Sequence, residues 1–381
     1  MIMRILHTAD WHLGKVVNEF SMLDLQKEYL TKLMNKIKEL EIDLLIMAGD
    51  LYDRAIPPKE AVSLANEVFT KLTQDLNIPV LVIAGNHDSN ERLEYGSSLL
   101  AASNLYIEGT SKDKIRKVEI DNVHLYLLPY DDHRNIRQIY NMEEIKTPAD
   151  ALKVQLQSIK ENWDEEAINI LLYHGFMINI TSDEKLDESD SERPLSIGTV
   201  DYVPHELVSA FDYVALGHLH KAQKVGSERI RYSGSPLKYS KSEANHKKQS
   251  LIIDISKNHF DIETLEIPLT KDLRIIRGKF ETIIKGQSDD YIFIELEDKD
   301  YVVDAMNKIR QNYPNTMGLE YIYQKQHDQL TLHHTKEKIK KISLKELFEE
   351  FYEQNTGMPL NEEQEKAIVQ SLKEIRTQEE A

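Results

Sequence analysis

Residues 43–53 read DLLIMAGDLYD, and this stretch decides the fold. Five apolar residues, Leu44–Ala48, are followed at once by Gly49 and Asp50. A short apolar run that ends in glycine predicts a buried strand, because it is too short for a helix and has no polar alternation. The carboxylate of Asp50 would then lie at the carboxyl end of that strand.

The flanking sequence repeats this arrangement. Met3–Thr8 and Val80–Ala84 also predict strands, and residues 21–40 and 58–76 between them have helical periodicity. Strand, helix, strand, helix, strand is the order of an α/β fold, with layered sheets flanked by helices. Further short apolar runs lie at Val118–Ile120, Val123–Leu128, Ile168–Tyr173 and Tyr213–Leu216.

Polar clusters follow five of these strands. Ligand sites in α/β sheets collect at the carboxyl ends of strands, so we expect clusters spread over 200 residues to converge. They are Asp10-Trp11-His12, Gly49-Asp50-Leu51-Tyr52-Asp53, Gly85-Asn86-His87-Asp88, His174-Gly175 and Gly217-His218-Leu219-His220.

The residue types in these clusters indicate a centre for two divalent ions. Carboxylate and amide oxygens with imidazole nitrogens suit ions such as Mn²⁺, and a pair of ions can generate a hydroxide that attacks phosphorus. We expect Asp50 to bridge the ions. One ion would take Asp10, His12, Asp50 and His220, and the other Asp50, Asn86, His174 and His218.

Composition narrows the possibilities. The 381 residues include no Cys, which excludes disulfides, thiolate metal sites and cysteine nucleophiles. No apolar run has the roughly 20 residues of a membrane span, and no signal peptide is recognisable, so we expect a cytoplasmic protein. The 47 Lys and Arg against 65 Asp and Glu give a net charge of −18, which argues against indiscriminate nucleic-acid binding.

The charge is unevenly distributed. Residues 221–248 hold eight basic and two acidic residues, which favours phosphate contact, although an ordinary solvated strand edge is the alternative. An acidic stretch, Thr181–Arg193, predicts a solvated loop. Candidate phosphate contacts, and DNA contacts if the ligand is a nucleic acid, are Lys15, Arg54, Lys221, Lys224, Arg231, Lys238 and Lys241.

The chain predicts three domains. A core over 1–270 is followed by a small α+β capping domain over 271–335, with strands at Leu273–Phe280, Tyr291–Leu296 and Leu319–Tyr323 and a helix at Tyr301–Arg310. Residues 336–381 predict a linker and C-terminal helices. Leu344, Leu347, Phe348 and Phe351 form a stripe that suits either partner binding or packing on the chain's own core.

In its five clusters the sequence resembles the calcineurin-like metallophosphoesterases and, more closely, the SbcCD family of double-strand-break repair nucleases. HTADWHLG at 7–14, AGDLYD at 48–53, IAGNHDS at 83–89 and YSGSPL at 232–237 carry the resemblance. It runs from residue 3 to about residue 255 and continues, less distinctively, to the C-terminus.

The resemblance implies a Mn²⁺-dependent DNA nuclease with 3′→5′ double-strand exonuclease and single-strand endonuclease activity. His87 would protonate the leaving oxygen or stabilise the transition state, and Asp88 would orient His87. Asp53 stands where some relatives have a histidine, so its role is open. The implied assembly is a homodimer within a heterotetramer, with an SbcC-type SMC-like ATPase bound by the C-terminal helices, acting at the nucleoid in hairpin removal, recombination and repair.

Two other functions remain possible from the sequence. A phosphatase or cyclic-nucleotide phosphodiesterase for small substrates could use the same core, but it would need neither the basic segment nor the C-terminal units. A non-catalytic protein that tethers DNA is the second alternative, and the complete ligand set argues against it.

Overall fold

The computed structural model describes residues 2–179, 186–192, 202–322 and 364. The chain divides into two compact units. The first comprises Met1–Ile276, Gln287–Phe293 and Arg310–Gly318, and the second comprises Arg277–Gly286, Ile294–Ile309 and Leu319–Ala381. The domain boundaries expected from the sequence stay a prediction, and the expected C-terminal helices lie outside the described residues except for position 364.

The first unit contains a six-stranded sheet in the order β16-β15-β1-β4-β5-β6. Strands β1, β4, β5 and β6 run parallel, and helices form the crossover connections that parallel strands need, while β15 pairs antiparallel with β1. The strands are β1 (Met3–Thr8), β4 (Leu44–Met47), β5 (Val80–Ile83), β6 (Leu105–Glu108), β15 (Ser250–Ser256) and β16 (His259–Leu265).

A second six-stranded sheet has the order β13-β14-β12-β9-β8-β7. Its central strands β14, β12, β9 and β8 are parallel. Strands β7 and β8 form the expected hairpin, in which Ile120 pairs with Val123. The strands are β7 (Arg116–Ile120), β8 (Val123–Leu128), β9 (Ile168–His174), β12 (Tyr213–Gly217), β13 (Gln223–Val225) and β14 (Ser227–Tyr232).

The two sheets pack face to face. Alternate residues of a strand point to opposite sides, so one set of apolar side chains faces the other sheet and the next set faces the helices. Ile5 and Ile46 of the first sheet share one buried cluster with Leu125 and Ile170 of the second. The neighbouring residue Leu6 points the other way, into a cluster with the helices of the first sheet. Sequence periodicity therefore predicted the layers correctly.

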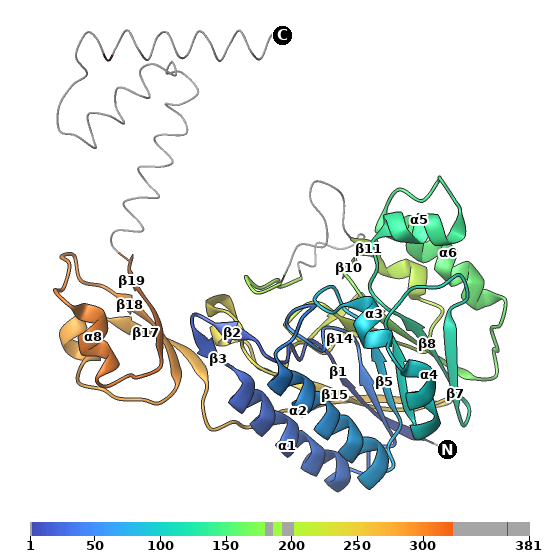
Figure 1. Ribbon diagram of the computed structural model, residues 1–381, viewed down its shortest axis with the longest axis horizontal. Helices are drawn as coiled ribbons and strands as arrows, with labels where there is room; N and C mark the ends of the chain where they lie inside the picture. The colour runs from blue at the N-terminus through green and yellow to red at the C-terminus, as the bar shows by residue number, and fades with distance from the viewer. Residues whose placement is uncertain (1, 180–185, 193–201, 323–363, 365–381) are drawn as a thin grey trace. The chain divides into compact units, whose positions relative to one another are not determined.

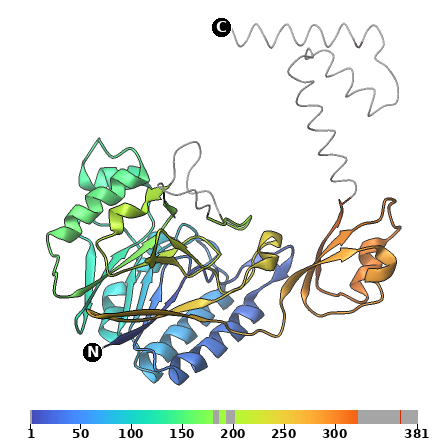
Figure 2. The same ribbon diagram turned by 180° about the vertical axis from the view of Figure 1, so that it is seen from behind.

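Helices cover the outer faces of both sheets (Figures 1 and 2). The helices α1 (Leu23–Glu39) and α2 (Lys59–Thr70) lie side by side on the first sheet, with an apolar stripe on α1 buried against it. The helix α6 (Pro148–Lys160) packs on the second sheet through Leu152, Leu156 and Ile159. Thr147 caps α6 by accepting from the N–H of Asp150, and Pro148 begins it.

Short elements complete the first unit. They are β2 (Val16–Val17), β3 (Phe20–Ser21), the π-helical turn Lys71–Asp75, α3 (Asn90–Glu94), α4 (Ser97–Leu100), α5 (His133–Tyr140), β10 (Met177–Ile178), β11 (Val203–Pro204), and 3-10 turns at Ala101–Ser103, His205–Val208 and Lys241–Asn245.

The strands β17 (Leu273–Gly278), β18 (Tyr291–Leu296) and β19 (Thr316–Tyr321) form a three-stranded sheet with α7 (Phe280–Ile283) and α8 (Ala305–Arg310). The expected helix at Tyr301–Arg310 was too long. Asp304 has a φ of 57°, outside the helical region, so the helix begins at Ala305. Phe280, expected to end a strand, begins α7.

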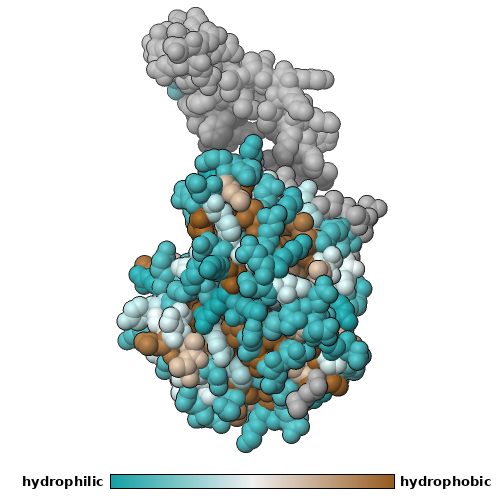
Figure 3. All heavy atoms as spheres, turned by 90° about the vertical axis from the view of Figure 1, so that its right-hand side faces the viewer, coloured by the Kyte–Doolittle hydropathy of each residue, from teal (hydrophilic) through white to brown (hydrophobic). Residues whose placement is uncertain are grey.

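The face of the molecule drawn in Figure 3 is mostly hydrophilic, with small apolar areas between polar side chains. Within the described residues, no helix has the length and apolar character needed to cross a membrane.

Replacing a side chain between the two sheets tests their packing. Ile46 is fully buried there, so Ile46→Ala should lower the free energy of unfolding by about 2–5 kcal/mol, through lost burial and the cavity left behind. Urea unfolding of the full chain measures this change. The matched variant Ile56→Ala, at a side chain that is 68% exposed, should change the free energy by less than about 0.5 kcal/mol. Equal effects would contradict the packing.

A buried histidine makes stability depend on pH. Burial lowers the pKa of His7 from 6.5 to about 3, and its Nδ1 lies 2.8 Å from the Tyr213 hydroxyl. Below pH 6.5 the unfolded chain therefore binds a proton at His7 that the folded chain does not bind, so the free energy of unfolding falls as the pH drops. Between pH 8 and pH 5, His7 should account for about 2 kcal/mol of this loss.

The measurement compares urea unfolding of wild type and His7→Gln at both pH values, with EDTA present. The variant should lose about 2 kcal/mol less than wild type. His259→Gln, at an exposed histidine, should behave as wild type does. Parallel losses for wild type and His7→Gln would refute this account.

Candidate metal centre

The seven expected ligands come together at the carboxyl ends of strands from both sheets. Asp10 and His12 follow β1, Asp50 follows β4 and Asn86 follows β5, all in the first sheet. The second sheet supplies the other three, since His174 ends β9, and His218 and His220 follow β12. All are buried except Asn86, which is half-buried.

The backbone is strained where it presents these ligands. Asp10, His12, Asp50 and His218 have φ angles of 54°, 46°, 55° and 114°. Such positive values are uncommon outside glycine and persist only where surrounding contacts enforce them. The N–H of His12 donates to the Asp50 carbonyl, and that of Asp10 donates to the Gly49 carbonyl. These bonds lock the two loops together.

Two glycines allow the sheets to meet at the site. Gly49 has a φ of 96°, and a Cβ there would lie 2.2 Å from His174 Nδ1. A Cβ on Gly217 would lie 1.9 Å from the Ala48 carbonyl oxygen. That same oxygen lies 2.9 Å from His174 Nδ1. Only glycine at both positions permits this close approach.

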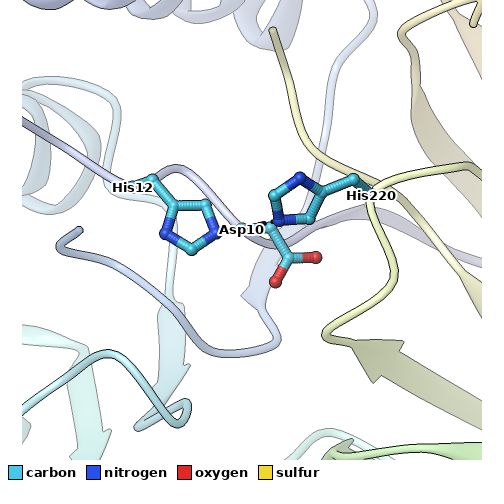
Figure 4. Close-up of side chains that lie close together, drawn as sticks. All are labelled: Asp10, His12 and His220. Carbon is cyan, nitrogen blue, oxygen red and sulfur yellow. Dashed lines mark hydrogen bonds between the residues drawn. The ribbon is translucent and has the colours of Figure 1, made fainter. Parts of the chain in front are cut away.

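One group of ligand atoms surrounds His12. The rings of His12 and His220 face each other with their Nε2 atoms 3.0 Å apart, and the carboxylate of Asp10 lies beside them (Figure 4). Ligand atoms of all three residues lie within 4.8 Å of one another. Two ring nitrogens at this distance can either share one proton or bind a common cation.

The second group surrounds Asn86. Its Oδ1 lies 3.0 Å from His174 Nε2 and 3.3 Å from His218 Nδ1. Because His174 Nδ1 donates to the Ala48 carbonyl, Nε2 carries a lone pair that faces the amide oxygen. Two lone pairs that face each other repel, unless a cation lies between them.

Asp50 lies between the two groups. Its Oδ2 is 3.6 Å from His12 Nε2 and also 3.6 Å from His174 Nε2, while its Oδ1 accepts from the N–H of His87 at 2.8 Å. One carboxylate oxygen is thus shared by both groups, as a bridging ligand requires.

The electrostatics suit divalent cations. Burial raises the pKa of Asp10 well above its usual value, and the neighbouring Asp50 raises it further. Burial lowers the pKa of His174 to about 4 and those of His12 and His218 well below 6.5, so these imidazoles are neutral at pH 7 and ready to bind metal. Ligands of an octahedral ion lie about 3 Å apart when each bond is about 2.1 Å. The separations of 3.0–3.3 Å within the two groups fit that spacing, and the two distances of 3.6 Å from Asp50 are longer.

His87 lies against the first group. Its ring centre is 4.6 Å from that of His12, and its Nδ1 lies 2.8 Å from the backbone carbonyl of Asp53. The carboxylate of Asp88, expected to orient His87, instead accepts from the N–H groups of Leu51, Tyr52 and Gly85. Asp88 therefore braces the two ligand loops, while the Asp53 carbonyl holds His87. Burial, and then Asp50, raise the pKa of Asp88 to about 7.

The side chain of Asp53 turns toward cations. Its Oδ1 lies 2.8 Å from Lys15 Nζ and 3.9 Å from His12 Nδ1, and its Oδ2 is 3.8 Å from Arg54. The residue thus balances charge beside the first group.

Most candidate DNA contacts are already engaged by acids of the same chain. Lys221 pairs with Asp187, and both Lys224 and Arg231 pair with Glu228. Lys238 is 13% exposed and pairs with Asp272, while Lys241 is half-buried. Arg54 is 55% exposed. The net charge of residues 221–248 therefore overstated the positive charge available to a ligand.

Sequence reasoning missed a polar cluster behind His220. Its members are Ser191, Glu192, Glu243 and Lys248, and Ser191 Oγ lies 2.7 Å from His220 Nδ1. The stretch Thr181–Arg193 was expected to be solvated, yet its described part, residues 186–192, places Ser191 and Glu192 half-buried against the site. One signal was available, since Glu243 is one of only two acids in the basic segment.

Two solved structures resemble this chain weakly. A dimetal phosphatase from Danio rerio has a TM-score of 0.41 and 11% identity, covering 69% of this chain and 96% of its own. A protein from Streptococcus pneumoniae described as a predicted phosphoesterase has a TM-score of 0.29 and 12% identity, covering 70% and 90%. Such likenesses are too weak to bear on fold or function.

Sequence relatives are more informative. Residues 3–222 match the calcineurin-like phosphoesterase family, and residues 269–356 match a domain described as the type 5 capsule protein repressor C-terminal domain. SbcD of the Staphylococcus epidermidis nuclease SbcCD is 35% identical over 373 residues, which cover 96% of this chain and 97% of that protein. The chain therefore belongs to the calcineurin-like phosphoesterases and, within them, to the SbcD family of nuclease subunits.

Proposed function

We propose that this chain hydrolyses phosphodiester bonds in DNA with two divalent ions, as the nuclease subunit of an SbcCD-type complex. The shared position of Asp50 Oδ2, 3.6 Å from a ring nitrogen of each ligand group, carries the proposal. A single ion would need only one of the groups. The relative named above is a subunit of a nuclease, which supports a nucleic acid as the substrate, and the family resemblance favours DNA.

The donor set fits a pair of divalent ions and favours Mn²⁺, because carboxylate and amide oxygens are combined with imidazole nitrogens. Asp10, His12 and His220 would hold one ion, Asn86, His174 and His218 the other, and Asp50 both. When bound, such a pair activates water as a nucleophile and offsets charge on the phosphate.

His87 is the proposed proton donor. Its Nδ1–H donates to the Asp53 carbonyl, which fixes the ring and its tautomer, so that Nε2 carries the lone pair. Once protonated at Nε2, the imidazolium keeps the bond to that carbonyl and can pass the new proton to the leaving oxygen. Asp88 acts as a positioning residue, because its carboxylate accepts from three backbone N–H groups and so holds the loops that carry Asp50 and His87.

Among the candidate DNA contacts, Arg54 is the strongest. It follows the Asp50 loop, and its side chain is 55% exposed, so it can reach a phosphate beside the metal centre. The side chain of Lys15 is only 14% exposed, and it pairs with Asp53 at 2.8 Å. Asp53 already offsets its charge, so Lys15 is the weaker candidate for a phosphate contact.

The proposal has further parts. The chain would act as a 3′→5′ double-strand exonuclease and single-strand endonuclease, and it would process hairpins in repair and recombination. It would bind an SMC-like ATPase through its C-terminal helices and act at the nucleoid. These parts come from the family resemblance. The C-terminal helices lie outside the described residues.

A homodimer is also proposed, and the structure offers a surface for it. A groove of about 820 Å³ lies between α2 and the segment 89–107, and it is lined by Val62, Phe69, Tyr95 and Leu100 among others. Tyr95 is 87% exposed and Val62 44% exposed. Apolar side chains gathered in one exposed groove indicate a protein contact.

Substitution of His87 tests the function. With Mn²⁺, wild type should cleave a labelled DNA duplex, and His87→Ala should be slower by about 10²–10⁴-fold because it lacks the proton donor. Calorimetry should show that both proteins still bind two Mn²⁺, since His87 is not a proposed ligand. His259→Ala, at an exposed histidine far from the clusters in sequence, should match wild type in both measurements.

A small phosphodiester assayed in parallel separates the alternatives. Hydrolysis of this ester with no DNA cleavage would overturn the nuclease proposal in favour of a small-substrate enzyme. DNA binding with no turnover of either substrate, even with the ATPase partner added, would favour a protein that only tethers DNA.

The proposed dimer is tested at Tyr95. Tyr95→Glu would place a charge in the groove, so light scattering should show a dimer for wild type and a monomer for the variant. Tyr301→Glu provides the matched control, because Tyr301 is a 73% exposed tyrosine outside the groove and should leave the dimer intact. A dimer that survives Tyr95→Glu would exclude this surface.

A further inference from the structure

The ring of His220 is bonded on its Nδ1 side, opposite the Nε2 atom that faces His12, by a buried chain of polar groups. None of these groups is a proposed metal ligand. His220 Nδ1 lies 2.7 Å from Ser191 Oγ and 3.2 Å from Glu243 Oε1. Ser191 Oγ in turn lies 2.5 Å from Glu243 Oε1. The side chains of His220 and Glu243 are fully buried.

The direction of these bonds follows from the carboxylate. Glu243 Oε2 accepts from Lys248 Nζ at 2.5 Å, and an ionised carboxylate can only accept. The hydroxyl of Ser191 must therefore donate to Glu243, and its oxygen is left to accept from His220. The proton of the neutral imidazole is thus placed on Nδ1.

This tautomer leaves the lone pair on Nε2, the atom that lies 3.0 Å from His12 Nε2 in the first ligand group. Imidazole ligands bind metal through such a lone pair, and the bond made by the opposite ring nitrogen decides which tautomer is present. The chain of polar groups behind His220 therefore prepares it as a ligand.

The backbone of His220 is held by the same elements. Its N–H donates to Glu192 Oε1 at 2.7 Å, and its carbonyl accepts from Lys248 Nζ at 2.8 Å. Lys248 also donates to Ser235 Oγ. Side chain and backbone of one ligand are thus fixed by residues 191 and 192 on one side and 243 and 248 on the other.

The segment 186–192 is attached to the core by contacts of its own. Asp187 pairs with Lys221, and its N–H donates to Gln223 Oε1 at 3.0 Å. The N–H of Asp190 donates to Ser242 Oγ at 2.9 Å. Ser242 thus ties the segment to the core. A control must lie outside this network, and Ser158 on α6 is suitable, since it is a half-buried serine whose hydroxyl donates to the Asp113 carbonyl.

We propose that Ser191 and Glu243, with Lys248 behind them, are positioning residues that hold His220 as a ligand of the first ion, and that residues 186–192 thereby control the occupancy of that ion. The proposal rests on the two-ion function above. It assigns the acidic stretch a part in metal binding that its composition does not suggest.

Mn²⁺ binding to the full chain, measured by calorimetry and by electron paramagnetic resonance, tests this assignment. Ser191→Ala should lower the affinity for one of the two Mn²⁺ ions by about tenfold, and Glu243→Gln should lower it by about 10–100-fold. The affinity for the other ion should change by less than about threefold. Ser191→Thr, which retains the hydroxyl, should bind both ions as wild type does.

Thermal unfolding in EDTA distinguishes positioning from folding. Ser191→Ala removes no charge, so its metal-free melting temperature should stay within a few degrees of wild type, even if Glu243→Gln fails to fold. Ser158→Ala should bind both ions normally.

Three outcomes would overturn the proposal: unchanged affinities in Ser191→Ala, an equal loss of affinity for both ions, or the same loss of affinity in Ser158→Ala. Wild type that binds fewer than two ions would refute the two-ion function, and this inference with it. Wild type that binds two ions beside an unaffected Ser191→Ala would refute this inference alone.

Discussion

Two buried carboxylates, Asp10 and Asp50, are the constraint on which the rest of this structure depends. Their ligand atoms lie within 4.8 Å of each other and of His174, where water cannot screen their repulsion. Backbone N–H groups of His218 and His87 donate to them, but four neutral imidazoles cannot offset the charge. The raised pKa of Asp10 means that a proton can relieve this repulsion when no cation is bound, so metal binding and protonation of the site depend on each other.

The architecture serves this site. The expected ligands come from both sheets, and the N–H of His218, which follows β12 of the second sheet, donates to Asp10, which follows β1 of the first. Gly49 and Gly217 let the strand ends approach closely enough for His174 to bond the Ala48 carbonyl. The backbone is strained where these side chains point into the site, as positive φ angles show at Asp10, His12, Asp50 and His218. The apolar packing of sheets and helices maintains that strain.

Charge acts differently in the sequence and in the folded chain. The net charge of −18 argued against DNA, and the eight cations of residues 221–248 argued for it. In the structure most of those cations are paired with acids of the same chain, and Lys248 is committed to Glu243. Charge counted along a chain does not show which groups remain available to a ligand, because Lys221 and Lys238 pair with acids outside the counted segment, Asp187 and Asp272.

The sequence by itself determined the layers and which polar residues meet at the strand ends. Apolar runs of strand length fixed β1, β4, β5, β9 and β12, and polar residues directly after them had to meet at strand ends. Only the tertiary structure decided how the ligands are held. That the Asp53 carbonyl rather than Asp88 bonds His87, and that Ser191 lies behind His220, depends on backbone groups and loop packing that leave no periodic pattern in the sequence.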